Sequence, residues 1–276
     1  MAGHGTDGRP KAASGAPPVR TRIVAVSMMK NEADVAVGVV ERLLAQGVDR
    51  VLVADNASTD GTRDLLADLA RRAPVDVVDD PDPRFLQAEK MTALAERAFA
   101  AHRPRWILPF DADEWWTLPR RLPLLGADAR STPILNYVCT GLDDPLEPDP
   151  LRRIRWRHAR GLYHKVVVRW RPGYALEIGN HHVLRKGRRV ETDPLPGLEL
   201  RHFAVRSLDH MVRKFATGKR ALDAAGDAIH GSSAFHWRDL GGLVESGDAT
   251  AIRTRFEREF FVADPRGVLV LDPVRP

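Results

Sequence analysis

Three carboxylates stand close together near the middle of the chain, at Asp111, Asp113 and Glu114 in the stretch RWILPFDADEWW. They follow a short apolar run at residues 105–110, which predicts a buried strand. If the backbone stays extended there, Asp111 and Asp113 share one face and enter the same pocket. Such close acids repel each other unless a cation lies between them, and Mg²⁺ or Mn²⁺ prefers oxygen ligands. The stretch therefore indicates a metal site, with a solvated acidic loop as the alternative.

The elements that position these acids are predicted from the spacing of apolar residues. Short apolar runs predict strands at residues 22–29, 50–55, 75–80 and 105–110. Helical spacing predicts helices between them, at residues 32–47, 59–72 and 85–102. Strands joined by helices favour a parallel sheet with both faces covered. The fold class is therefore α/β, with a mostly parallel central sheet flanked by helices. From residue 133 short strands follow one another, so the sheet should become mixed, and residues 206–229 predict a C-terminal helix.

Polar residues follow each of the four predicted strands. The segments are MMKNEAD, ADNASTDGT, DDPDPR and DADE. In parallel sheets ligands bind beyond the carboxyl ends of the strands, so these segments predict one ligand-binding rim. Helix capping is the alternative for single residues. Asn31 and Glu32 would then cap and begin the first helix, and Thr59 or Asp60 would open the second.

Composition excludes several classes of protein. The 276 residues are 43% hydrophobic and 29% charged, which is typical of a soluble globular chain. A net charge of +5 is compatible with an anionic ligand or an acidic membrane surface, but no nucleic-acid-binding module accompanies it. The single cysteine, Cys139, excludes an internal disulfide and a cysteine-based zinc cluster.

The sequence predicts a cytoplasmic protein, with peripheral contact at the inner face of the membrane as a further option. No run approaches the roughly 18 apolar residues of a membrane-spanning helix. The first 20 residues contain no apolar core of a signal peptide. Residues 1–20 are rich in Gly, Ala and Pro and predict a disordered tail. Residues 21–276 are expected to form one domain.

Three of these segments resemble a known family. MMKNEADV, VLVADNASTDGT and WILPFDADEWW resemble the successive motifs of glycosyltransferase family 2, whose members have the GT-A fold and use nucleotide-sugar donors. YHKVVVRW, IGNHHV and LRHFAVRSLDHMVRKFATGKRAL resemble, more loosely, later blocks of the bacterial branch that carries a D-x-D-E motif. The resemblance implies a Rossmann-like GT-A domain. Residues 21–118 would bind the nucleotide sugar, and residues 119–276, with the C-terminal helices, would bind the acceptor.

The resemblance also implies roles for individual residues at the donor site. Asp55 would contact the base or ribose of the nucleotide, and Asn31 and Glu32 would line the same pocket. Asp113 would bind Mn²⁺ or Mg²⁺, and Asp111 would bind the metal or the ribose. Further candidates for donor binding are Lys90, Arg206 and Lys214, of which the last two match family positions that would reach the diphosphate.

The expected reaction needs both charge stabilisation and a base. Breaking the sugar–phosphate bond leaves negative charge on the diphosphate, which a divalent cation stabilises. Inversion at the anomeric carbon, the expected outcome, needs a base for the acceptor hydroxyl. Members of another branch supply it in an E-D dipeptide after the D-x-D motif, which this sequence lacks. The candidate bases are Glu114, His181, Asp143 and Asp144. His181 is also the candidate third metal ligand, with His182 and His202 as alternatives.

The acceptor is expected to be a glycan, a lipid-linked molecule or a small molecule. The basic stretch at residues 149–160 would contact an anionic acceptor or a membrane, or would be a solvated loop. Trp115 and Trp116 would stack on a sugar or pack in the core.

Two other functions remain open from the sequence. A nucleotidyltransferase would also join a Rossmann-like sheet to metal-binding acids, but it would place a Gly-rich loop after the first strand, where SMMKNEAD has none. A non-catalytic module that only binds a nucleotide sugar is the other alternative, because no base can be assigned.

Overall fold

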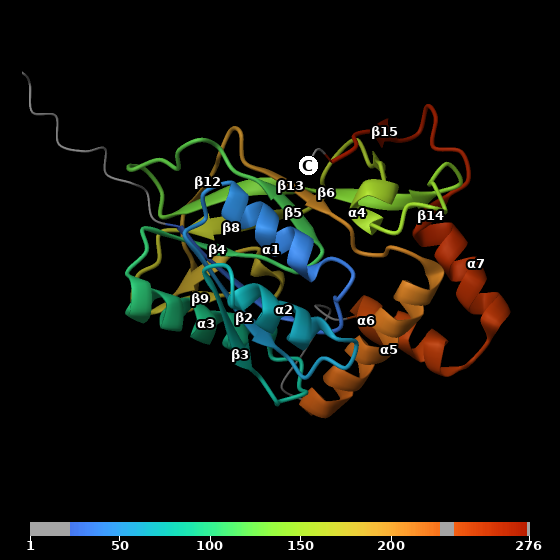
Figure 1. Cartoon of the computed structure of the whole chain (residues 1–276), viewed down its shortest axis with the longest axis horizontal. Helices are drawn as coiled ribbons and strands as arrows, with labels where there is room; N and C mark the ends of the chain where they lie inside the picture. The colour runs from blue at the N-terminus through green and yellow to red at the C-terminus, as the bar shows by residue number, and fades with distance from the viewer. Residues whose placement is uncertain (1–22, 227–234, 275–276) are drawn as a thin grey trace, which may run out of the picture.

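The four predicted strands of the N-terminal half lie side by side and parallel in the central sheet (Figure 1). The structure is a computed structural model that describes residues 23–226 and 235–274. The parallel strands run in the order β3, β2, β1, β4, and their bounds are Ile23–Met29 for β1, Arg50–Asp55 for β2, Val75–Asp79 for β3 and Trp106–Pro109 for β4. The predicted disordered tail lies outside the described residues.

Helices cover both faces of these strands, as predicted. Helices α1 (Ala36–Ala45) and α2 (Thr62–Ala70) pack on one face, and α3 (Gln87–His102) packs on the other. Successive side chains of a strand point to opposite faces, so Ala25 joins the cluster of α1 and α2 while Val24 joins the cluster of α3. The apolar runs are therefore buried on both sides, which a parallel sheet requires.

The C-terminal half extends the sheet with both antiparallel and parallel pairs of strands, so the sheet is mixed as expected. Strand β8 (His164–Val168) is antiparallel to β4 and to the long strand β6 (Ala129–Thr140). Strand β13 (Glu199–His202) pairs with β5 (Glu114–Thr117) and with β6. The other strands joined to this sheet are β7 (Trp156–Arg157), β12 (Thr192–Pro194), β14 (Phe261–Val262) and β15 (Val270–Leu271). A second sheet contains β9 (Tyr174–Leu176), β10 (Val183–Arg185) and β11 (Arg188–Arg189).

The remaining helices lie in the second half of the chain. The short helix α4 (Pro150–Arg153) belongs to the basic stretch, and a 3₁₀ turn, η1, spans Ile178–Asn180. Helix α5 (Leu208–Ala225) ends earlier than predicted and is followed by α6 (Phe235–Glu245) and α7 (Ala249–Glu259), beside it in Figure 1. Within the described residues, no helix is both long enough and apolar enough to cross a membrane.

The first two helices begin later than predicted, so Asn31 does not cap the first helix, whereas Asp60 Oδ1 accepts from the N–H of Thr62, the first residue of α2, at 3.0 Å. Helix α1 begins at Ala36, and α2 begins at Thr62 after Gly61. The physical reason is that the two loops before these helices bind each other. The Asn31 backbone N–H donates to Ser58 Oγ at 3.0 Å, and Asn31 Oδ1 accepts from the Thr59 N–H at 2.7 Å. The Ala33 N–H donates to Asp60 Oδ2 at 3.1 Å.

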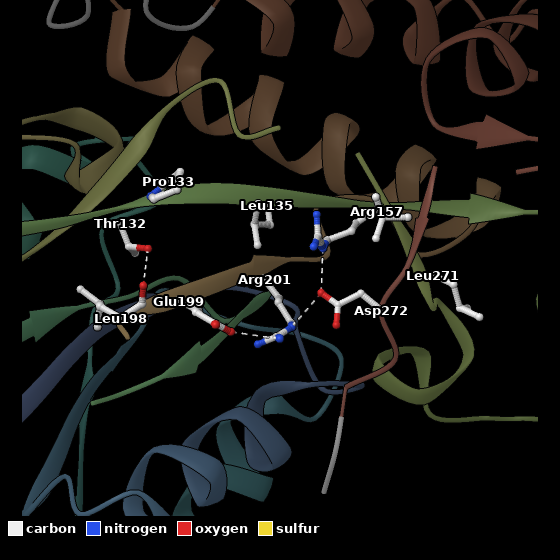
Figure 2. Close-up of a pocket in the computed structure, with 10 residues that line it drawn as sticks. Thr132, Pro133, Leu135, Arg157, Leu198, Glu199, Arg201, Leu271 and Asp272 are labelled. Carbon is white, nitrogen blue, oxygen red and sulfur yellow. Dashed lines mark hydrogen bonds and ion pairs between the residues drawn. The ribbon is translucent and has the colours of Figure 1, made fainter. Parts of the chain in front are cut away.

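A cavity of about 450 Å³ lies between β6, β13 and the C-terminal segment. Figure 2 shows Arg157 and Arg201 both directed at Asp272. Their Nε atoms lie 2.7 and 3.5 Å from Asp272 Oδ2, and the Tyr137 hydroxyl donates to the Asp272 carbonyl at 2.7 Å. These contacts hold the C-terminal segment against the sheet. Arg201 precedes His202 in β13, so the cavity lies on the face opposite the side chain of His202.

Replacing Asp272 with Asn should loosen the C-terminal segment, because Arg157 loses its carboxylate partner and Arg201 keeps Glu199, which is not part of that segment. We expect the free energy of unfolding to fall by about 1 kcal/mol, the upper end for partly exposed ion pairs. Hydrogen exchange of the amides in β15 should accelerate. Asp264→Asn is the control, because that acid pairs with Arg266 on the open surface. Equal exchange in the two variants would show that the Asp272 ion pairs do not anchor the segment.

Candidate active site

Asp111 and Asp113 lie in a tight turn between β4 and β5, and Glu114 is the first residue of β5, so the extended backbone considered above is not observed. The Glu114 N–H donates to the Asp111 carbonyl at 3.1 Å, which closes the turn. Glu114 Oε2 accepts from the Asp111 N–H at 3.0 Å and from Trp116 Nε1 at 3.2 Å. As a result, Glu114 is fully buried and holds the turn, and the carboxylates of Asp111 and Asp113 contact different partners.

Lys165 of β8 neutralises two of the acids. Its Nζ lies 2.5 Å from Asp111 Oδ2 and 2.7 Å from Glu114 Oε1, and the residue is only 3% exposed. Burial alone would lower the pKa of Lys165, but the two carboxylates raise it above its ordinary value. Burial also raises the pKa of Glu114. The sequence reasoning missed Lys165, although a lysine at the start of the buried run HKVVV was a signal that it needs a charged partner.

Asp113 has a second set of partners, which comes from β13 and α5. Lys214 Nζ lies 2.5 Å from Asp113 Oδ2, and His202 Nε2 lies 3.5 Å from Oδ1. Burial opposes ionisation of Asp113, but Lys214 and His202 hold its pKa well below the ordinary value. His202 Nδ1 lies 2.8 Å from Asn136 Oδ1, so the imidazole ring is held between Asn136 and Asp113.

Arg206 is buried behind this group rather than directed at a ligand. It is 2% exposed and donates to Glu32 Oε2 at 2.5 Å and to both Asp34 oxygens at 2.7 and 2.8 Å. These bonds tie the loop after β1 to the segment before α5. Glu32 in turn lies 3.8 Å from Lys214, and burial raises its pKa. Of the two basic candidates for the diphosphate, Lys214 is therefore the one beside Asp113.

Asp55 and Lys90 lie at the neighbouring part of the rim, beyond β2 and β3. Asp55 is 5% exposed, and its Oδ2 accepts from the Ser58 N–H at 3.1 Å. Its Oδ1 is buried without a hydrogen-bond partner in the part of the chain that the structure describes. Lys90 pairs with Asp80 at 2.8 Å and donates to the Asp82 carbonyl at 2.6 Å. Lys90 thus holds the third loop against α3, and Asn56 Nδ2 of the second loop donates to Asp80 Oδ2 at 2.9 Å.

His181 and His182 lie on the Asp111 side of the site, away from Asp113. His181 Nδ1 is 2.7 Å from the carbonyl of His164, and burial lowers the pKa of His181. The His182 ring meets the His164 ring edge-on at 4.8 Å. Among the described residues, no group of three or more His, Cys, Asp or Glu is arranged to hold a metal ion. His202 is the histidine whose ring nitrogen lies beside the second acid of the D-x-D motif.

The remaining candidates serve their own local structure. Asp143 accepts from the backbone and hydroxyl of Thr140, and Asp144 accepts from the Leu146 N–H. Trp116 is fully buried, and Trp115 is 9% exposed with the Arg42 guanidinium 5.3 Å from its ring centre. The two tryptophans therefore pack in the core.

The fold and the charged rim define an α/β enzyme whose site lies beyond the carboxyl ends of its strands. A model of the family described as Glycosyl transferase family 2 matches residues 25–186, which is more than half of the chain. The chain belongs to glycosyl transferase family 2 and is a glycosyltransferase. This confirms the family resemblance and the GT-A fold class expected from the sequence.

Further comparisons give more distant likenesses. No curated protein matches the chain. The structure of S. aureus TarS 1-349 in complex with UDP is 10% identical, with a TM-score of 0.40 over 86% of this chain and 74% of that one. The same TarS segment in complex with UDP-GlcNAc gives a TM-score of 0.35. A longer S. aureus TarS structure is 9% identical, with a TM-score of 0.37 over 84% of this chain and 50% of that one.

Replacing Lys165 with Met should destabilise the protein strongly, because Asp111 and Glu114 lose their shared counter-charge. Removing one partner of a buried ion pair costs about 3–5 kcal/mol of unfolding free energy. Adding Glu114→Gln should restore part of this loss, because the amide can still accept the bonds that close the turn. Urea denaturation measures both variants. If Lys165→Met loses no more stability than Arg188→Met on the exposed strand β11, the pairing is not structurally important.

His210 should make the protein less stable below neutral pH. It is 6% exposed on α5, and burial, with Arg206 and Lys214 nearby, lowers its pKa to about 2. Below the unfolded pKa of about 6.5 the unfolded chain binds a proton that the folded chain excludes, so stability falls by about 1.4 kcal/mol per pH unit. Denaturation between pH 7.5 and 5.5 should show a shallower decline for His210→Asn than for the unchanged protein. If the free energy of unfolding falls equally steeply with decreasing pH in both proteins, the buried His210 is not the source of the pH dependence.

Proposed function

We propose that this glycosyltransferase transfers a sugar from a nucleoside-diphosphate sugar to an acceptor hydroxyl. The observation that supports the proposal best is the group formed by Asp113, His202 and Lys214 at the carboxyl end of β4. An acid, an imidazole and an ammonium in one place suit a diphosphate leaving group and its counter-ion. In this proposal residues 21–118 bind the donor, and residues 119–276 bind the acceptor.

The nucleoside would lie along the rim beside β2. The buried Oδ1 of Asp55, which has no hydrogen-bond partner among the described residues, would accept a hydrogen bond from the base or ribose. Lys30 lies at the same place, where burial lowers its pKa and Lys90 and Asp55 are its charged neighbours. Asn31, Glu32 and Lys90 would shape this pocket by holding its loops, because their polar groups are engaged with neighbouring loops or with α5.

The residues around Asp113 fit a divalent cation. Five carboxylates face three basic side chains in this region, which leaves two formal negative charges: Glu32, Asp34, Asp111, Asp113 and Glu114 against Lys165, Arg206 and Lys214. Asp113 and His202 would hold Mn²⁺ or Mg²⁺, which typically keep places for substrate phosphates. When bound, the ion would stabilise the negative charge of the departing diphosphate. Asp111 would support the site through its bond to Lys165 rather than as a ligand.

His181 is the side chain that best suits a base for the acceptor hydroxyl in an inverting reaction. Its Nδ1–H donates to the His164 carbonyl, which leaves the lone pair on Nε2. Burial lowers its pKa, so the imidazole is neutral at neutral pH. Tyr163, which is 66% exposed, has its ring 5.8 Å from that of His181 and would form part of the acceptor surface. Glu114 is less suited, because Lys165 and Trp116 already engage it.

Nucleotide binding should raise the melting temperature of the protein. We expect a shift with at least one nucleoside diphosphate, and a larger shift when Mn²⁺ is added. Asp113→Ala should remove the contribution of Mn²⁺, and Asp55→Ala should weaken nucleotide binding with or without the metal. Asp79→Asn is the matched control, because Asp79 ends β3 at the same rim but its side chain is 75% exposed and paired with Arg63. No shift with any nucleoside diphosphate would refute the proposed donor class.

Two assays distinguish a glycosyltransferase from a non-catalytic module and from a nucleotidyltransferase. Both use the nucleotide that raises the melting temperature. Hydrolysis of the corresponding nucleotide sugar indicates transfer chemistry, whereas binding without hydrolysis supports a non-catalytic module. Release of pyrophosphate from the nucleoside triphosphate would instead support a nucleotidyltransferase. The anomeric configuration of the product, measured by NMR, distinguishes inversion from retention.

A further inference from the structure

The ammonium group of Lys214 lies directly against the carboxylate of Asp113, where a metal ion would bind. This contact suggests that metal binding and nucleotide binding depend on each other. We propose that Lys214 is an internal counter-ion that occupies the cation position on Asp113 until the diphosphate of the donor draws it away. Nucleotide and metal would then each favour binding of the other, with Lys214 as the coupling residue. The inference rests on the proposed function, because it takes the donor to be a nucleoside diphosphate and Asp113 to be the metal ligand.

Asp113 cannot bind a metal through Oδ2 while Lys214 stays in place. Lys214 Nζ lies 2.5 Å from Oδ2, and His202 Nε2 lies 3.5 Å from Oδ1, so both oxygens face a nitrogen. A metal ion bound to Oδ2 would occupy the space of the ammonium and repel its charge. Lys214 is therefore a competitor for the cation position.

Lys214 is the least enclosed of the three basic side chains in this group. Arg206 is 1% exposed along its side chain and bonds to Glu32 and Asp34, and Lys165 is 4% exposed between two carboxylates. The side chain of Lys214 is 17% exposed, and its only close carboxylate among the described residues is Asp113, since Glu32 lies at 3.8 Å. A lysine is a compact charge on a flexible four-carbon stem, so it changes partners more readily than the planar guanidinium of an arginine.

The charges favour an exchange of partners. With Lys214 turned away, the five acids of the site face only Lys165 and Arg206, so the surplus grows from two to three negative charges, which a divalent cation reduces to one. The displaced ammonium needs a new anionic partner, and a diphosphate carries more charge than the carboxylate it replaces. The exchange is therefore favourable only when metal and diphosphate arrive together. Each ligand must then increase the affinity for the other by the same factor.

The test measures Mn²⁺ affinity directly, by electron paramagnetic resonance of free Mn²⁺ during titration, with and without UDP or GDP, whichever raises the melting temperature. In the unchanged protein we expect the nucleotide to tighten Mn²⁺ binding by roughly 5- to 150-fold, the ordinary range of coupling energies. Lys214→Met should bind Mn²⁺ alone more tightly, by a similar factor, and should lose most of the enhancement by nucleotide. Lys219→Met is the control, because Lys219 lies on the same helix but pairs with Asp223 and Glu245 instead.

The outcomes separate this inference from the proposed function. If Lys214→Met binds Mn²⁺ as the unchanged protein does, while Asp113→Asn abolishes binding, the counter-ion role is overturned and the metal site stands. If Asp113→Asn leaves Mn²⁺ binding intact, the proposed metal site fails and the inference falls with it. Lys214→Gln, which keeps a polar group of similar reach, gives a second variant if Lys214→Met does not fold, and it should show the same loss of coupling.

Discussion

The structure depends on the neutralisation of acids that gather where the parallel strands end. Isolated charges buried at such a rim would be costly, so each needs a partner. The partners come from the other half of the chain: Lys165 from β8, Lys214 from α5 and Arg206 from the segment before it. The same ion pairs therefore join the two halves and build the site between them.

These ion pairs divide the rim into a fixed part and an adaptable part. Lys165 lies between two carboxylates, fully enclosed, and Glu114 at the same time closes the turn that carries Asp111. Lys214 has one close carboxylate and some access to solvent. In the proposed reaction the fixed acids would stay in position while charge builds up on the leaving diphosphate, and Lys214 would respond to that charge.

The polar residues in the loops at the rim have two different roles, loop structure and ligand contact. Asn31, Ser58 and Asp60 hold the first two loops together, so their polar character reflects loop structure. Asp55, one strand end away, keeps a buried oxygen without a hydrogen-bond partner among the described residues. An unsatisfied buried acceptor is unfavourable on its own, which makes it a natural contact for a ligand.

The sequence by itself determined the α/β class, the parallel strands and the rim, because strand and helix periodicities and the residues that end each strand are local features. It also located the acids, since D-A-D-E follows its strand directly. Only the tertiary structure decided their partners. Lys165 lies 54 residues from Asp111, Lys214 lies 101 from Asp113, and Arg206 lies 174 from Glu32. Contacts over such separations depend on how β8, β13 and α5 pack. For this reason the family resemblance could offer three histidines as the third metal ligand, His181 first and His182 and His202 as alternatives, and only the fold shows that His202 lies beside Asp113.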